Sequence, residues 1–122
     1  MVNSVTNLTR SGLCDWLVQR VTAVFLGLYT LFIVGYVITT PSLDYGHWKD
    51  LFGCFWMQVA TMIALLSLLA HAWIGMWTIT TDYLNTHNLG RYSLLIRLPV
   101  QLLCLLALII YLLWGIQIIW GL

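Results

Sequence analysis

Residues 21–40 read VTAVFLGLYTLFIVGYVITT, twenty consecutive positions without a charged side chain. Two longer uncharged stretches follow, at 51–81 and at 98–122. The hydrocarbon core of a bilayer is about 30 Å thick, and roughly 20 helical residues cross it. Each of the three stretches therefore predicts one membrane-spanning helix.

The composition agrees with a membrane protein. Of 122 residues, 61% are hydrophobic and only 7% are charged, whereas a soluble domain carries about 25% charged residues. So few charges cannot coat a water-soluble surface, which excludes the soluble enzymes. Five Lys and Arg against four Asp and Glu leave no basic surface for nucleic acid. Three widely spaced cysteines without a CxxC pair indicate neither a disulfide framework nor a zinc site.

The predicted fold class is an all-α membrane protein, with residues 1–122 forming a single membrane-anchor domain. Its three transmembrane helices are expected at about 16–40, 52–82 and 93–120. Pro41 ends the first helix, and residues 45–50 are expected to form a short polar turn. A second turn is expected at 85–90, where Asn and Gly residues favour a helix end. The second helix is long enough to tilt or to project beyond the membrane.

Basic residues predict the orientation. Arg10 and Arg20 precede or open the first helix and Arg91 and Arg97 border the third, whereas Lys49 stands alone on the opposite side. By the positive-inside rule, the N-terminus faces the cytoplasm and the C-terminus the periplasm. The polar opening, residues 1–16, has no cleavage pattern of a signal peptide and is expected to lie at the membrane surface.

Three helices bury little of one another, so the chain is expected to form half of a larger helical bundle. A transporter would show internal symmetry, broken helices or several intramembrane charges, and the sequence has none of these. The polar residue that stands out is His71, in LLSLLAHAWIGMW (65–77). An ionisable side chain in hydrocarbon is costly and marks a candidate functional site.

Two interpretations of His71 remain open from the residues alone. It can be a neutral imidazole hydrogen-bonded to Ser67 or to a partner helix, or it can be an axial ligand of heme iron. At 100° per residue, a stripe of small or polar residues passes through His71: Ser67, Gly75, Thr78 and Asp82. Such a stripe leaves room for a flat macrocycle or for a close helix.

Because His47 and His87 belong to the expected turns, a heme with two histidine ligands would take the second one from a partner chain.

Asp82 and Tyr83 close the second helix. A tyrosine hydroxyl can donate a hydrogen bond to a quinone carbonyl, and a carboxylate can hold a proton; the pair can equally be an interfacial tyrosine beside a helix-terminal aspartate. Arg20 can reach the lipid phosphates, pair with Asp15, or meet an anion such as a heme propionate.

The chain resembles the smaller hydrophobic membrane-anchor subunit of bacterial succinate dehydrogenase, the succinate:quinone oxidoreductase (complex II) of the respiratory chain. The similarity runs nearly from end to end. It is densest in HAWIGMWTITTDY (71–83) and continues in the R-x-G-x-x-D pattern of residues 10–15, in Arg20, and in the closing Trp120-Gly121-Leu122.

The resemblance implies a heme b held between two anchor chains by one histidine from each, with His71 as the axial iron ligand from this chain. It implies that Arg20 lies near the heme propionates, that Tyr83 hydrogen-bonds ubiquinone, and that Asp82 is the acidic neighbour at the quinone site. The chain departs from the pattern at Cys14, where the family has a histidine, so no role is transferred to that position.

The resemblance also implies partners in the bacterial inner membrane: a second, cytochrome b556-type anchor subunit, an iron–sulfur subunit and a flavoprotein subunit. The soluble subunits are expected to dock on segments 1–15 and 83–92. Succinate oxidation belongs to the flavoprotein, so no catalytic residue is assigned to this chain. Two alternatives are an anchor of a fumarate reductase, several of which lack heme, and a heme-free structural membrane protein.

Overall fold

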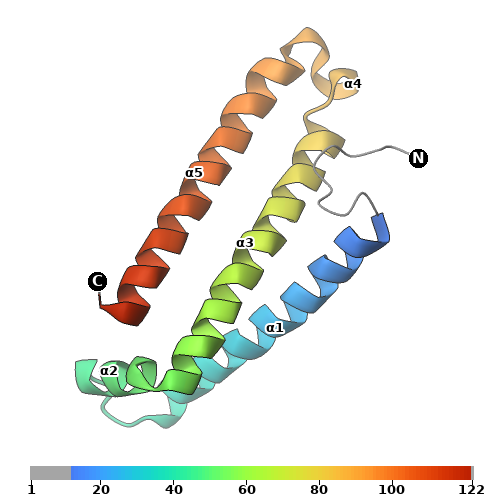
Figure 1. Ribbon diagram of the computed structural model, residues 1–122. Helices are drawn as coiled ribbons and strands as arrows, with labels where there is room; N and C mark the ends of the chain where they lie inside the picture. The colour runs from blue at the N-terminus through green and yellow to red at the C-terminus, as the bar shows by residue number, and fades with distance from the viewer. Residues whose placement is uncertain (1–11, 122) are drawn as a thin grey trace.

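The computed structural model describes residues 12–121, and the regular secondary structure in that range is entirely helical. Three long helices, each long and apolar enough to cross a membrane, form its frame (Figure 1): α1 (Gly12–Thr39), α3 (Phe55–Tyr83) and α5 (Ser93–Trp120). The three predicted transmembrane helices are thus confirmed. The first begins four residues earlier than expected and carries Asp15 in its first turn, where a negative charge is favourable to a helix N-terminus. Arg10 lies outside the described residues.

The expected polar turn at 45–50 is wrong. The structure has a separate helix there, α2 (Tyr45–Gly53). Asp44 caps this helix: its Oδ1 accepts a hydrogen bond from the His47 backbone N–H at 3.0 Å, while the Asp44 N–H faces the His47 ring. The Asp44 side chain thus satisfies one of the backbone donors that a helix start leaves unpaired, and its 2.7 Å contact with His47 Nδ1 joins the two side chains. The cap therefore converts a polar connection into a helix.

The second connection also contains helical turns. Short α4 (Thr86–Leu89) starts at Asn85, whose side chain accepts from the Asn88 N–H at 2.9 Å. It ends at Gly90, which has a positive φ of 58°, a conformation that glycine adopts without steric cost. A single 3₁₀ turn, η1 (Gly90–Tyr92), then leads into α5. The turn expected at 85–90 is therefore a short helix that ends before Gly90 and a 3₁₀ turn that begins there.

Helix α3 is the centre of the molecule, because it packs against both α1 and α5. Figure 1 shows α5 running alongside α3 and α1 crossing it obliquely, with α2 lying across one end. The start of α1, the end of α3 and the α4 connection share the other end. The two ends of the bundle are thus built from different segments. His47, in α2, lies at one end, and Asp82 and Tyr83, at the end of α3, lie at the other.

Hydrogen bonds between side chains join α3 to both neighbours. Tyr29 on α1 lies 2.7 Å from Thr61 on α3, and because the Thr61 hydroxyl donates to its own helix backbone, the tyrosine donates to it. On the other side, the Gln101 amide donates to Thr80 at 3.0 Å. Gln58 donates to the Ile119 carbonyl at 3.2 Å. Side-chain bonds of this kind hold helices together where hydrocarbon supplies no hydrophobic drive.

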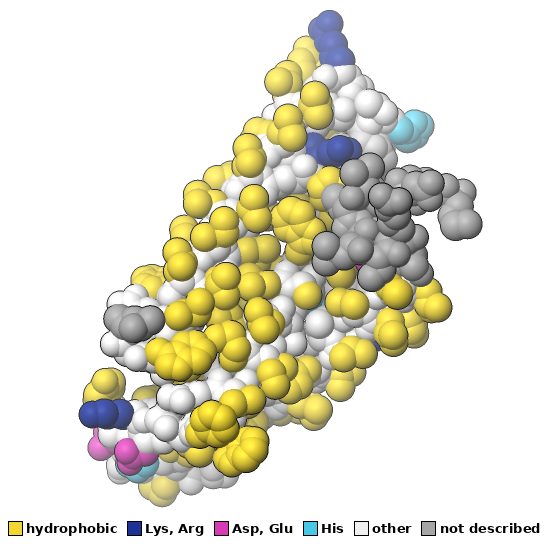
Figure 2. Space-filling view, viewed as in Figure 1, with side chains coloured by type: hydrophobic (Ala, Val, Ile, Leu, Met, Phe, Trp, Pro, Cys, Tyr) yellow, Lys and Arg dark blue, Asp and Glu magenta, His cyan; other side chains and the backbone are white. Residues whose placement is uncertain are grey.

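Few apolar side chains are buried inside the described part of the chain, namely Met57, Ala64, Met76 and Ile119. Large apolar side chains instead point outward along all three long helices. Figure 2 shows this hydrophobic flank, with charged side chains towards its two ends. Such a surface suits lipid or a further helical subunit, and not water.

The close approach of α5 to α3 depends on Gly115. A methyl group at this position would lie 2.6 Å from Leu65 Cδ2, whereas one at Gly27 on α1 would meet nothing within 4 Å. We expect Gly115→Ala to lower the thermal midpoint of the solubilised protein relative to Gly27→Ala, because the Leu65 side chain would have to move aside for the added methyl group. The control Gly27→Ala should leave the thermal midpoint unchanged or raise it. Equal midpoints for the two variants would contradict the packing described.

The α2 cap predicts a pH dependence. The backbone N–H of His47, and then the His47 ring, hydrogen-bond the Asp44 carboxylate and hold the pKa of Asp44 below its ordinary value of 3.8. A lowered pKa means that the cap is fully formed above 3.8 and is lost as pH falls through the lower value. Asp44→Ala should therefore speed amide hydrogen exchange in α2 at neutral pH, whereas Asp44→Asn, which can still cap, should not. Identical exchange in Asp44→Ala and the parent protein would contradict the cap.

Candidate functional site

His71 lies in the middle of α3, sixteen residues after its first residue and twelve before its last. Its imidazole is half-buried. Nδ1 lies 3.1 Å from the Thr22 hydroxyl on α1. The hydrogen-bond partner is thus a neighbouring helix of the same chain, and not Ser67 one turn back.

The small-residue stripe of α3 faces α1 over part of its length. A Cβ at Gly75 would lie 3.5 Å from the amide nitrogen of Gln19, and Thr22 meets His71 one turn away. At His71 and Gly75 the stripe therefore serves contact between helices of the same chain, which is the close-helix alternative that the sequence left open. Further along, Thr78 and Asp82 are exposed.

Gln19 leaves an unusual atom at this contact. Its Oε1 is buried and has no hydrogen-bond partner within the described part of the chain. Buried side-chain oxygens are normally paired, and a donor from outside this chain would satisfy it. The contact between α1 and α3 beside His71 thus contains one buried oxygen atom that lacks a hydrogen-bond donor from the described residues.

Arg20 does not face His71. Arg20 precedes Thr22 by two residues, which places the two side chains about 200° apart around the helix. The Arg20 side chain is exposed. The guanidinium lies 5.6 Å from the ring centre of Trp16, one turn away on the same helix. Within residues 12–121 the ion pair found is Asp44 with His47, so the suggested pairing of Arg20 with Asp15 is not formed.

Asp82 and Tyr83 occupy the end of α3, and both side chains are exposed. Their backbone carbonyls accept hydrogen bonds from the side chains of Asn85 and Asn88, at 2.9 and 3.1 Å. These two bonds fix the end of the helix and the start of the connection. The Tyr83 hydroxyl and the Asp82 carboxylate remain open to a group outside the described residues.

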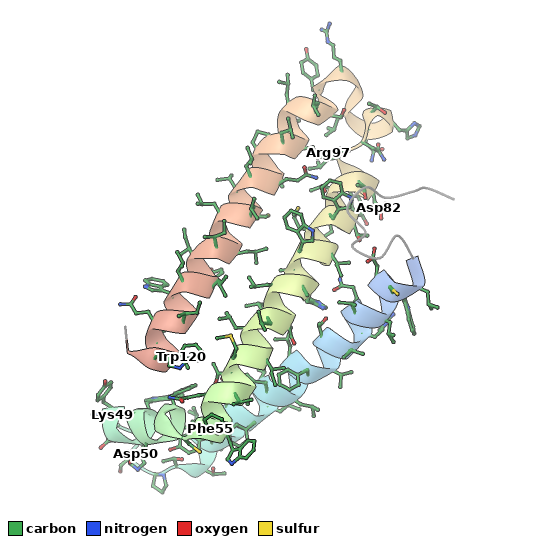
Figure 3. All side chains as sticks on the ribbon, viewed as in Figure 1. Lys49, Asp50, Phe55, Asp82, Arg97 and Trp120 are labelled. Carbon is green, nitrogen blue, oxygen red and sulfur yellow. The ribbon has the colours of Figure 1, made fainter. Side chains whose placement is uncertain are left out.

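Asp82 shares its end of the bundle with Arg97 of α5, whereas Lys49 and Asp50 lie at the opposite end (Figure 3). The Arg97 guanidinium turns onto α3, with its centre 5.9 Å from the Trp77 ring. Eleven residues separate His71 from Asp82, a rise of about 16 Å along α3. The structure therefore keeps His71 and the Asp82–Tyr83 pair as two separate sites on one helix.

Sequence reasoning missed Thr22 and Gln19. A signal for them exists in the residue spacing, because polar residues of the first helix recur at intervals of three, four and seven: Asp15, Gln19, Thr22, Tyr29 and Tyr36. Residues with these intervals share one face of a helix. That polar face is the one that α1 presents to α3 through Thr22 and Tyr29.

Two apolar grooves flank α3 away from His71 and from the Asp82–Tyr83 pair. One, of about 440 Å³, lies between α1 and the α2–α3 segment, and another, of about 410 Å³, lies between α3 and α5. Neither is lined by His71, Asp82 or Tyr83. Within the described residues no group of three His, Cys, Asp or Glu side chains could hold a metal ion, so a metal at His71 would need other ligands.

Comparison with known proteins gives the family. Residues 4–108 match the model of the succinate dehydrogenase/fumarate reductase transmembrane subunit. The chain belongs to this family. It is 37% identical over 119 residues to a succinate dehydrogenase hydrophobic membrane anchor subunit of Coxiella burnetii, an alignment that covers 98% of this chain and 97% of the relative.

Relatives of the same description occur in Rickettsia. The anchor subunit of Rickettsia felis is 32% identical over 101 residues, covering 80% of this chain and 78% of the relative. That of Rickettsia conorii is 29% identical over 107 residues, covering 84% and 79%. The family resemblance is thus confirmed, and the chain is a membrane anchor of the succinate dehydrogenase type.

Proposed function

We propose that this anchor holds heme b jointly with a second anchor subunit and lines a ubiquinone-reducing site at the cytoplasmic face of the bacterial inner membrane. The complex would also contain an iron–sulfur subunit and a flavoprotein subunit, and electrons would pass from succinate to ubiquinone. The observation that carries the proposal is His71, a half-buried imidazole in the middle of a membrane span. Because the chain belongs to a family of membrane subunits of oxidoreductases, an electron-transfer cofactor is the ligand that we infer for this imidazole.

The residues around His71 fit a heme. A neutral imidazole is a common axial ligand of heme iron, and ligating histidines usually donate their other ring N–H to a neighbouring acceptor. Thr22 offers such an acceptor at Nδ1, and Nε2 makes no hydrogen bond to a described residue. When bound, heme b supplies a one-electron redox centre within the membrane.

The second axial ligand would come from the partner anchor. His47 belongs to α2 and is bonded to Asp44, and His87 belongs to α4 at the opposite end of the bundle. Neither can meet His71 without rebuilding the fold. Arg20, exposed on α1, is free to reach a carboxylate outside the chain, such as a heme propionate, by a charge-assisted hydrogen bond.

Asp82 and Tyr83 would bind the quinone. Reduction of ubiquinone to ubiquinol takes up two electrons and two protons at the two carbonyl oxygens. The Tyr83 hydroxyl can donate a hydrogen bond to one oxygen and favour the negative charge that develops on it. A tyrosine hydroxyl gives up its proton less readily than a carboxylic acid does, so Asp82, with water, is the better group to relay protons from the cytoplasm.

The orientation follows from the basic residues. Arg97 lies at the bundle end that contains the end of α3, Arg91 belongs to η1 directly before α5, and Lys49 lies at the other end. Arg20 lies on α1 next to Gln19, which approaches Gly75 in the half of α3 nearer the Arg97 end. The positive-inside rule places the first end in the cytoplasm. That end carries Asp82 and Tyr83, so a soluble iron–sulfur subunit docked on residues 83–92 would be next to the quinone.

The same architecture would also serve fumarate reduction, with quinol as the electron donor. The family model covers the transmembrane subunits of both enzymes. The anchor subunits of Coxiella and Rickettsia described above all carry the succinate dehydrogenase name. This favours succinate oxidation as the direction of electron flow.

Replacing His71 tests heme ligation. In the purified complex, His71→Ala should remove one axial bond and either change the spin state of the heme or empty the site. The control is His87→Ala, because His87 is exposed in α4 and should leave the spectrum unchanged. The measurement is the reduced-minus-oxidised optical spectrum together with heme content. An unchanged low-spin, bis-imidazole spectrum in His71→Ala would contradict the assignment.

Replacing Tyr83 tests the quinone site. Tyr83→Phe keeps the ring and removes the hydroxyl, so quinone reduction should fall by about 10²–10³-fold, the usual effect of losing one transition-state donor. Succinate oxidation with an artificial acceptor should stay near normal. Tyr92→Phe is the matched control, since Tyr92 is exposed at the same end and its hydroxyl accepts from Arg91. Wild-type quinone turnover and affinity in Tyr83→Phe would remove Tyr83 from the site.

A further inference from the structure

The hydrogen bonds of Thr22 determine which atom carries the shared proton. The Thr22 hydroxyl has one proton, and two helix carbonyls lie within its reach: that of Val18 at 2.6 Å and that of Gln19 at 3.2 Å. The shorter contact takes the proton. With this proton committed to Val18, the Thr22 oxygen can only accept at its contact with His71.

The donor at the 3.1 Å contact is therefore Nδ1 of His71. In a neutral imidazole one nitrogen carries hydrogen and the other carries a lone pair. A proton on Nδ1 leaves the lone pair on Nε2. A metal can bind only the nitrogen with the lone pair, so the Thr22 contact selects Nε2 as the possible ligand atom.

The surroundings hold this arrangement in place. Thr22 is only 9% exposed, so its oxygen is largely shielded from competing donors. On one side of it the Tyr29–Thr61 hydrogen bond joins α1 to α3, and on the other side Gln19 lies close to Gly75. A rotation of α1 that removed Thr22 from His71 would break these contacts as well.

We propose that Thr22 is a positioning residue for His71. It holds the imidazole in the tautomer protonated at Nδ1, directs Nε2 towards heme iron, and increases the electron donation of that nitrogen, as outer hydrogen bonds to ligating histidines do. The proposal rests on the proposed function, in which His71 ligates heme. It adds that the ligand is prepared within this chain, before the partner anchor contributes its own.

The test is Thr22→Val in the purified complex, which removes the hydroxyl and keeps a branched side chain. A weaker electron donor at Nε2 stabilises ferric iron less, so the midpoint potential of heme b should become more positive. Heme should also be lost to excess apomyoglobin faster, by about 10- to 100-fold, the range by which such outer hydrogen bonds affect metal affinity.

Three variants make the result specific. Thr22→Ser keeps the hydroxyl and should restore the wild-type potential. Thr22→Cys, whose sulfur is a weak acceptor, should give an intermediate shift and keeps the test decisive if Thr22→Val does not assemble. Thr61→Val removes another hydrogen bond between α1 and α3, about 15 Å along α3 from His71, and should leave the heme potential unchanged.

The outcomes separate the two claims. If the wild-type complex lacks heme b, or if His71→Ala keeps the wild-type spectrum, the proposed function fails and this inference fails with it. If His71 ligates heme but Thr22→Val and Thr22→Cys match Thr61→Val in potential and in heme loss, only the role of Thr22 is overturned. A positive shift in Thr22→Val that Thr22→Ser reverses would establish it.

Discussion

Hydrocarbon supplies no hydrogen-bond partner, and the polar side chains within the three long helices are arranged accordingly. Backbone groups are satisfied inside each helix, which is the reason that the membrane part of the chain is helical. Hydroxyl, amide and imidazole groups then pair across helices, as Thr22 does with His71, Tyr29 with Thr61, and Gln101 with Thr80. Most large apolar side chains remain on the outside. The molecule is therefore organised from polar contacts around α3, with lipid or another subunit needed to cover the rest.

This organisation gives α3 two separate candidate sites. Its middle carries His71, held from α1, and its end carries Asp82 and Tyr83, with the following connection fixed by Asn85 and Asn88. A redox centre inside the membrane and a quinone site at the membrane surface would both be mounted on one rigid helix. On α1, the buried Gln19 oxygen lacks a hydrogen-bond donor among the described residues, and Arg20 is exposed. Groups from outside the chain can hydrogen-bond to both.

The membrane spans could be predicted from the sequence, because an uncharged stretch of twenty or more residues has few alternatives to a transmembrane helix. The third helix was expected at 93–120 and is found at Ser93–Trp120. The 45–50 segment was predicted wrongly, since an Asp44–His47 cap is not among the usual Ser or Thr to Glu cap patterns. His71 could be singled out by its burial in an apolar stretch, but its partner could not. Thr22 meets His71 only through the register of α1 against α3, which depends on side-chain packing along the whole interface.

The central claim is that this chain is half of a heme-binding membrane anchor. It is tested most directly by purifying the intact complex from membranes through a tag on this chain and measuring heme b per chain, alongside the polypeptides that co-purify. The account predicts one heme b for each copy of the chain, together with a second hydrophobic anchor and subunits that contain flavin and iron–sulfur clusters. The chain recovered alone, or with those subunits but without heme b, would contradict it.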